Sequence, residues 1–189
     1  MSLLVIGSVA FDDVETPYGH AEKIVGGAGT YIAWSASYFT HAIRMVSIIG
    51  EDFPLTELEA LQKRGVDTAG IKIVEGGKSF FWAGRYFNNL NSRETLVTDL
   101  NVLADFDPVL PPHFRDSEFV MLGNLLPSVQ LSVINQMAHR PKLIALDTMN
   151  YWMDNAMDEL KEVLSKIDLL IINDEEARQL SGHYSLLRA

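Results

Sequence analysis

Residues 168–176 read Asp-Leu-Leu-Ile-Ile-Asn-Asp-Glu-Glu, a short apolar run that ends in an amide and three carboxyl groups. The run 168–172 is typical of a buried strand, and Asp174 begins a predicted helix that ends at Gly182. The same order occurs twice earlier in the chain, with strands over 118–123 and 142–147 and helices over 128–139 and 154–166. Because these strands are almost wholly apolar, the segment predicts a parallel sheet covered by helices on both faces.

The N-terminal half of the chain continues this alternation. Apolar strands are expected over 3–9 and 44–50, with a helix rich in small residues over 28–40. Pro54 suits the first turn of a further helix, and Gly65 is a natural end for it. The predicted fold class is therefore α/β, as a three-layer α/β/α, doubly wound, mostly parallel sheet.

Residues 71–98 have a different character. The β-prone runs 71–74 and 80–87 are separated by Gly76-Gly77 and followed by Asn88-Asn89-Leu90-Asn91, which is hairpin chemistry without an intervening helix. We expect a small β-rich lid made mainly by residues 71–98, with a short contribution from about 14–25.

Composition limits the functional classes. The 189 residues are 48% hydrophobic and 21% charged, which is typical of one globular domain. A net charge of -10 disfavours nucleic acid as a partner, and the lack of cysteine excludes disulfides and thiolate metal sites. The start of the chain has no basic region, and its apolar runs fall far short of the ~20 residues of a spanning helix. We expect a soluble, cytoplasmic protein that does not bind membranes.

Ligands of open parallel sheets bind beyond the carboxyl ends of the strands, so polar residues there are candidate site residues. Asp12 follows the first strand and could accept two hydroxyl hydrogen bonds from a polyol, or could be a solvated turn residue. Gly26 and Gly27 precede a helix, where they would let the backbone approach a ligand or form a tight turn. Asn124 and Asn150 also follow strands and resemble the wall of a small-molecule site.

The strand over 168–172 leads into Asn173, and Glu176 follows in the first turn of the predicted helix. An amide and a carboxylate at this position suit hydrated Mg²⁺ and phosphate oxygens. The same residues could instead cap the helix and complement its dipole. Gly76-Gly77-Lys78-Ser79 ends like a phosphate-binding loop, but Lys72 stands where that motif requires glycine.

Taken together, these segments resemble the ribokinase-like (PfkB) carbohydrate kinase family. The resemblance covers nearly the whole chain, in the family's order. It runs from Gly7-Ser8 and Asp12 through Gly26-Gly27-Ala28-Gly29 and Ile49-Gly50-Glu51-Asp52 to the Asn173-x-x-Glu176 pair. The β-rich excursion corresponds to the family's lid, which closes over the sugar.

The resemblance implies a role for each matched residue. Asp12 would bind substrate hydroxyls, and Gly26 and Gly27 would present backbone amides to the sugar. Asn173 and Glu176 would position Mg²⁺ and the phosphates of ATP, with Glu176 reaching the metal through water. Tyr31 stands where the family has asparagine, so its ring would stack on a sugar face or a base. The implied cofactors are ATP and Mg²⁺, and the implied partner is a sugar or nucleoside. Independently of the resemblance, the aromatic residues of segment 80–87 could make the lid the surface of a homodimer.

One family segment has no match. The later Gly-Ala-Gly-Asp run, whose Asp deprotonates the attacking hydroxyl, does not occur in this sequence, so no catalytic residue is assigned. The fold of the family takes about 300 residues, near the upper size of a single core. We expect the N-terminal, sugar-binding part of an ATP-dependent sugar or nucleoside kinase, an incomplete domain that is inactive as it stands. The alternatives are a non-catalytic binding module without the ATP side and a nucleotide-binding oxidoreductase domain.

Overall fold

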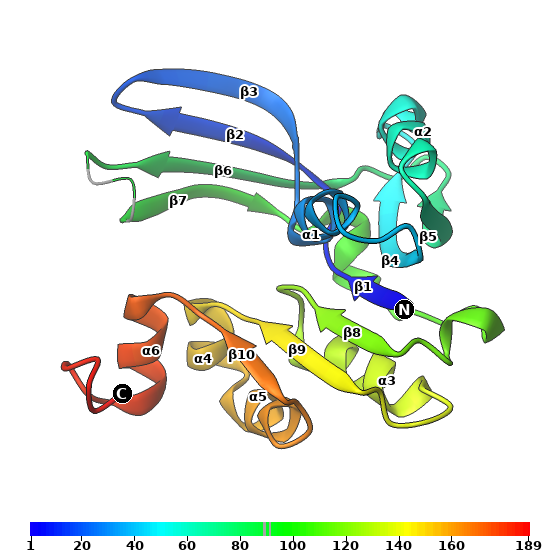
Figure 1. Ribbon diagram of the computed structural model, residues 1–189. Helices are drawn as coiled ribbons and strands as arrows, with labels where there is room; N and C mark the ends of the chain where they lie inside the picture. The colour runs from blue at the N-terminus through cyan, green and yellow to red at the C-terminus, as the bar shows by residue number, and fades with distance from the viewer. Residues whose placement is uncertain (89, 91) are drawn as a thin grey trace.

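The computed structural model describes residues 1–88, 90 and 92–189, which form a large and a small sheet (Figure 1). The large sheet has six strands in the order β10-β9-β8-β1-β4-β5, and all of its neighbouring pairs are parallel. Its strands are β1 (Leu3–Ile6), β4 (Ile43–Gly50), β5 (Val66–Val74), β8 (Phe119–Leu122), β9 (Leu143–Asp147) and β10 (Leu169–Ile171).

Helices cover both faces of this sheet. Successive side chains of a strand point to opposite faces, and in these strands both sets are apolar, so each face needs a covering layer. Val5 of β1 packs in one core cluster with Ala33 of α1 and with Leu58 and Leu61 of α2. Leu4 and Ile6 pack in the other cluster with residues of α3 and α5. The helices are α1 (Ala28–Ala36), α2 (Leu55–Lys63), α3 (Pro127–Gln136), α4 (Asn150–Asn155), α5 (Met157–Leu164) and α6 (Asp174–Ser181), with short 3₁₀ turns η1 (Asn101–Asp105) and η2 (Pro112–Phe114). The predicted doubly wound α/β fold is confirmed.

The small sheet, which we call the lid, has the strand order β3-β2-β6-β7. Its strands are β2 (Ala10–Thr16), β3 (Gly19–Gly26), β6 (Phe80–Tyr86) and β7 (Arg93–Asp99). The β2–β3 and β6–β7 pairs are antiparallel, whereas β2 and β6 run parallel. In Figure 1 the lid projects beyond the large sheet, on the same side as α4 and α6.

The position of the lid in the sequence differs from the prediction in two respects. Residues 71–74 belong to β5, which pairs with β4 in the large sheet, so Gly76-Gly77 joins two sheets and does not close a hairpin. Two of the four lid strands, β2 and β3, come from residues 10–26. The strand expected over 3–9 ends at Ile6, and the chain then enters the lid at Ala10. Just after Ile6, the Gly7 backbone packs so closely on α1 that a Cβ would lie 2.5 Å from the Gly29 nitrogen. Asn89 and Asn91 of the predicted turn lie outside the described residues.

A buried serine joins the lid to the large sheet. The Ser79 hydroxyl accepts a hydrogen bond from the Gly50 N–H (3.0 Å) and donates one to the Asp52 carboxylate (2.8 Å). The Ser79 N–H donates to the same carboxylate oxygen, and Asn101 donates to the Ser79 carbonyl. The segment that resembled a phosphate-binding loop is therefore the joint at which β6 leaves the large sheet.

Two smaller differences concern helices. The helix expected over 154–166 is α5, and a separate short helix, α4, precedes it, because the backbone of Ala156 leaves the helical region (φ -145°, ψ 37°). The glycine ends are as predicted, with Gly65 and Gly182 both at positive φ. In the described part of the chain, none of the helices combines the length and apolar character that a membrane crossing requires.

Candidate active site

The site lies at the carboxyl ends of the strands, where the winding of the large sheet reverses between β1 and β8. The two strands end in close contact, since the Gly123 N–H donates to the Ile6 carbonyl (2.7 Å). The lid leaves the large sheet directly after β1, so its first residues lie over this crevice. Two groups of candidate residues lie at this edge, one where the lid begins and one at the end of β9 and the start of α6.

The first group is Asp12 with Gly26 and Gly27. The Asp12 carboxyl group lies directly on the Gly26 backbone, so close that a Cβ at Gly26 would stand 2.1 Å from Oδ2. Gly27 is the N-cap of α1 at φ 93°, and a Cβ there would stand 2.4 Å from the Ser8 carbonyl oxygen. A side chain at either glycine would therefore clash with these neighbours, and the positive φ of Gly27 also favours glycine.

The pKa of the Asp12 carboxyl group lies above its ordinary value. Burial raises its pKa to about 6; the Gly27 N–H opposes this rise and the charge of Asp13 adds to it. The next two amides of the α1 N-terminus already have partners, since Ala28 donates to the Ser8 hydroxyl and Gly29 to the Ser8 carbonyl. The carboxylate is therefore the group of this cluster that is best placed to accept hydrogen bonds from a ligand.

The second group centres on Asp147 and Glu176. Asp147 is the last residue of β9, and its pKa is raised to about 6 by burial and then by the charge of Glu176, while the N–H groups of Asn124 and Thr148 oppose the rise. The two carboxyl groups therefore lie near each other, one at the end of β9 and the other in the first turn of α6. Asp147 was not among the predicted site residues, although a carboxylate that ends an apolar strand is a signal that the sequence contains.

Asn173 and Glu176 form a reciprocal cap at the start of α6. The Glu176 N–H donates to Asn173 Oδ1 and the Asn173 N–H donates to Glu176 Oε2, each over 2.9 Å. The Glu176 side chain is only 5% exposed, whereas Asn173 is exposed. The capping interpretation of this pair is confirmed, and the cap fixes Glu176 beside Asp147.

The two predicted asparagines of the site wall hold elements together. Asn124 accepts a hydrogen bond from the Trp152 indole N–H (2.8 Å) and donates to the Met149 sulfur (3.1 Å), which ties the end of β8 to α4. Asn150 donates to Gln179 of α6. Their amides thus position the segment that follows Asp147.

Tyr31 lies outside both of these groups. Its hydroxyl donates to the Val25 carbonyl (3.2 Å), and its ring helps to line a cavity of about 170 Å³ together with residues of α1, α2 and β3. Val25 pairs with Phe11, and this pair occupies the face of the lid opposite to Asp12. The structure therefore places the Tyr31 ring at the back of the lid.

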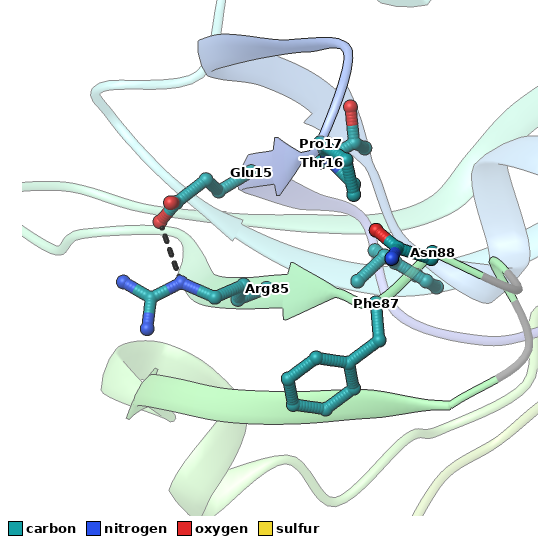
Figure 2. Close-up of a pocket in the computed structure, with 7 residues that line it drawn as sticks. Glu15, Thr16, Pro17, Arg85, Phe87 and Asn88 are labelled. Carbon is teal, nitrogen blue, oxygen red and sulfur yellow. Dashed lines mark hydrogen bonds and ion pairs between the residues drawn. The ribbon is translucent and has the colours of Figure 1, made fainter.

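A larger cavity, of about 510 Å³, lies at the far end of the lid (Figure 2). It is lined by Glu15, Thr16, Pro17, Arg85, Tyr86, Phe87 and Asn88. Glu15 and Arg85 point toward each other there and form an ion pair of 3.0 Å. None of the predicted site residues lines it, and its two charges satisfy each other, so the strand ends remain the better candidate.

The second group suits a divalent cation that also binds phosphate. Asp147 and Glu176 offer carboxylate oxygens, and the neighbouring Thr148 Oγ1 is buried with no hydrogen-bond partner among the described residues. Within residues 1–88, 90 and 92–189, no cluster of three or more His, Cys, Asp or Glu side chains could hold a metal. Two carboxylates with water and substrate oxygens are a usual ligand set for Mg²⁺, so the residues fit this ion.

Comparison with known proteins identifies the family of the chain. The family model described as pfkB family carbohydrate kinase matches residues 2–186. The cytidine kinase of Thermococcus kodakarensis is 26% identical over 186 residues, and the alignment covers 96% of this chain and 65% of that kinase. The chain therefore spans slightly less than two thirds of this relative.

Solved structures share the fold. The PfkB protein from Polaromonas sp. JS666 matches with a TM-score of 0.74 at 13% identity, over 100% of this chain and 71% of that one. The nucleoside kinase of Burkholderia thailandensis, in complex with inosine, matches with a TM-score of 0.71 at 13% identity, over 97% of this chain and 64% of that one. Because the family model matches residues 2–186, which is almost the whole of this chain, the chain belongs to the pfkB family of carbohydrate kinases.

Proposed function

We propose that this chain is the acceptor-binding part of a kinase that transfers the γ-phosphoryl group of MgATP to a hydroxyl of a sugar or nucleoside. The observation that carries the proposal is the half-buried Asp12 carboxyl group, seated on Gly26 and Gly27 where the lid joins the sheet. An ionised carboxylate in this position can accept two hydroxyl hydrogen bonds at once. The match to the carbohydrate kinase family supports the same proposal of a kinase that acts on a hydroxyl.

The two groups of residues have different roles, one in binding the acceptor and the other in binding Mg²⁺. Asp12 orients the acceptor, and the lid excludes water from it. Asp147, Glu176 and Thr148 would hold Mg²⁺, which when bound neutralises phosphate charge. Arg93 on β7 adds positive charge above this group, since its charge lowers the pKa of Asp147 against the effect of burial.

Calorimetric titration of the chain with ribose, fructose, cytidine and inosine tests acceptor binding. We expect at least one of them to bind, and Asp12→Asn to weaken that binding at least tenfold, because an amide cannot accept two charge-assisted hydrogen bonds. Asp13→Asn is the matched control, since the Asp13 carboxylate accepts a hydrogen bond from the Lys23 N–H. Equal losses in the two variants would contradict the role of Asp12.

Magnesium binding has its own test. We expect millimolar Mg²⁺ to raise the Tm of the chain at pH 8, because the ion relieves the repulsion between Asp147 and Glu176. Asp147→Asn should remove this shift, and Glu175→Gln, a neighbouring exposed carboxylate on α6, should retain it. A shift that survives in Asp147→Asn would place the ion elsewhere.

We also propose that the 189 residues do not catalyse turnover, because no segment of this sequence matches the family's Gly-Ala-Gly-Asp run. A coupled assay for ADP with each acceptor tests this, and turnover well above background would contradict it. A non-catalytic binding module would give the same titrations and the same absence of turnover. Sequencing the gene beyond Ala189 separates the two, since further coding with that run supports the kinase.

The lid is the proposed surface for a homodimer. On β7, Leu96 and Val97 are 45% and 40% exposed. Sedimentation velocity should show a dimer that dissociates more readily in Leu96→Lys/Val97→Lys. Leu55→Lys, a similarly exposed position on α2, is the control. A dimer unaffected by the lid variant would contradict this surface.

A further inference from the structure

An aromatic pair shares the face of the lid that carries Asp12. In the parallel pairing of β2 and β6, Asp12 is the register partner of Trp82, and Tyr86 lies four residues further along β6. Side chains two and four residues apart in a strand point to the same side. Asp12, Trp82 and Tyr86 therefore lie on one face.

This face looks toward the second group of site residues. The opposite face carries Phe11 and Phe81, which pack into the core beside α1 and α2. Arg93 pairs with Tyr86 across β6 and β7, and its charge acts on Asp147 at the end of β9. The aromatic pair is thus on the crevice side of the lid.

The indole of Trp82 is seated on a glycine. A Cβ at Gly84 would stand 2.1 Å from Cη2 and 2.3 Å from Cζ2 of Trp82, so the six-membered ring lies across the Gly84 backbone, which it helps to bury. The indole N–H donates to the Thr95 hydroxyl (3.3 Å), and the Tyr86 ring meets the indole edge-on at a centroid distance of 6.4 Å. The indole therefore rests on the sheet, and the Trp82 side chain remains partly exposed to solvent.

The indole extends beyond the reach of a free sugar. It begins in register with Asp12 and continues to Gly84, about 7 Å further along the lid at the usual rise per residue. A pentose whose hydroxyls bond to Asp12 would leave much of this flat apolar surface in water. A planar base attached to that pentose would cover it, and bases stack on aromatic side chains through their π faces.

We infer that Trp82 is a stacking surface for the base of a nucleoside whose ribose hydroxyls bind Asp12, so that the acceptor is a nucleoside and not a free sugar. The inference rests on the proposed function and narrows its acceptor class. The stacking role of Trp82 also explains the glycine at position 84, since a larger residue there would displace the indole from the sheet.

Calorimetric titration of the 189-residue chain with cytidine, inosine and ribose tests the inference. We expect Trp82→Ala to weaken binding of both nucleosides about 10- to 100-fold, the usual loss for a base stack. Ribose binding should change less than twofold. Gly84→Val should have the same selective effect with Trp82 still present, and Trp34→Phe, on α1, should have none. Circular dichroism checks that each variant is folded, and the milder Trp82→Phe replaces any variant that is not.

Fluorescence gives a second readout. The chain has three tryptophans, so Trp34→Phe/Trp152→Phe leaves Trp82 as the sole indole. Cytidine and inosine should quench its emission with the affinities measured by titration, whereas ribose should not.

The outcomes separate the two proposals. Nucleoside affinity within twofold of wild type in Trp82→Ala, or an equal loss for ribose, would overturn the inference and leave the proposed function standing. Binding of ribose that is tighter than binding of either nucleoside would also overturn it. If no acceptor binds the wild-type chain, both are overturned.

Discussion

Asp12 and Asp147 are two carboxyl groups in similar surroundings. Each follows or ends a short buried strand, each is partly buried, and the pKa of each is raised to about 6. Burial is the largest cause in both, and a second carboxylate adds to it, Asp13 in one case and Glu176 in the other. At neutral pH the chain therefore holds two ionised groups in places that disfavour their charge, which is common at functional sites.

This situation predicts a pH-dependent gain in stability from Asp12→Asn. The folded-state pKa lies above the ordinary value of 3.8, so the folded chain binds the proton more tightly and loses stability as the pH rises from about 4 through 6. The full cost is present above that window. Asp12→Asn should therefore raise the free energy of unfolding at pH 8 by about 1–2 kcal/mol, allowing for solvent screening, and by little at pH 4.

Urea unfolding at the two pH values measures this difference. The control is Asp158→Asn, because the Asp158 side chain is fully exposed. A gain of the same size at pH 4 and pH 8 would mean that packing, and not charge, is responsible.

At the scale of elements, the reciprocal cap of α6 has two structural effects. It satisfies backbone N–H groups at the start of the helix, and it holds Glu176 beside Asp147. Asn173→Ala should lower the free energy of unfolding by about 1 kcal/mol, as for other N-caps. Asn173→Asp should restore most of it, since aspartate also caps.

Chemical denaturation of both variants provides the measurement, with Glu175→Gln as the control in the same helical turn. If Asn173→Ala and Glu175→Gln have equal effects, the loss comes from the helix dipole and not from the cap.

The joint at Ser79 is the second element-scale feature. Its hydroxyl links the end of β4 to the start of the lid and is almost completely buried. Ser79→Ala leaves the Gly50 N–H without its partner, so we expect a loss of about 1–3 kcal/mol in the free energy of unfolding. Hydrogen exchange should show the largest increase at Gly50 and in β6. Ser165→Ala, at an exposed helix end, should lose little, and an equal loss there would contradict the role of the joint.

At the scale of the whole molecule, β10 lies at one edge of the large sheet with apolar side chains in water. Leu169 and Ile171 are 46% and 48% exposed, and β10 pairs only with β9 among the described strands. Unpaired apolar edges favour association. We expect the chain to associate at high concentration and Leu169→Lys/Ile171→Lys to reduce this association, measured by sedimentation velocity. Leu55→Lys is again the control, and equal association in all three proteins would contradict the prediction.

Sequence patterns were informative where the chemistry is local. The apolar strands of the large sheet, the glycine ends of α2 and α6 and the Asn173–Glu176 cap follow from residues close together in the chain. The lid was only half predicted, because nothing local distinguishes a turn that closes a hairpin from Gly76-Gly77, which joins two sheets. Asp147 was passed over for a similar reason, since its importance comes from Glu176, 29 positions later in the chain.

The sequence by itself determined the α/β class and the family resemblance, and it indicated Asp12, Gly26, Gly27, Asn173 and Glu176 as candidate site residues, because period, turn and capping preferences act over a few residues. Only the tertiary structure decided which residues share a face and which are buried. Strand register puts Asp12 and Trp82 on one face of the lid and Tyr31 at its back, and burial shifts the pKa of Asp12 and Asp147. Register and burial depend on contacts between segments far apart in the chain, which no short stretch of sequence specifies.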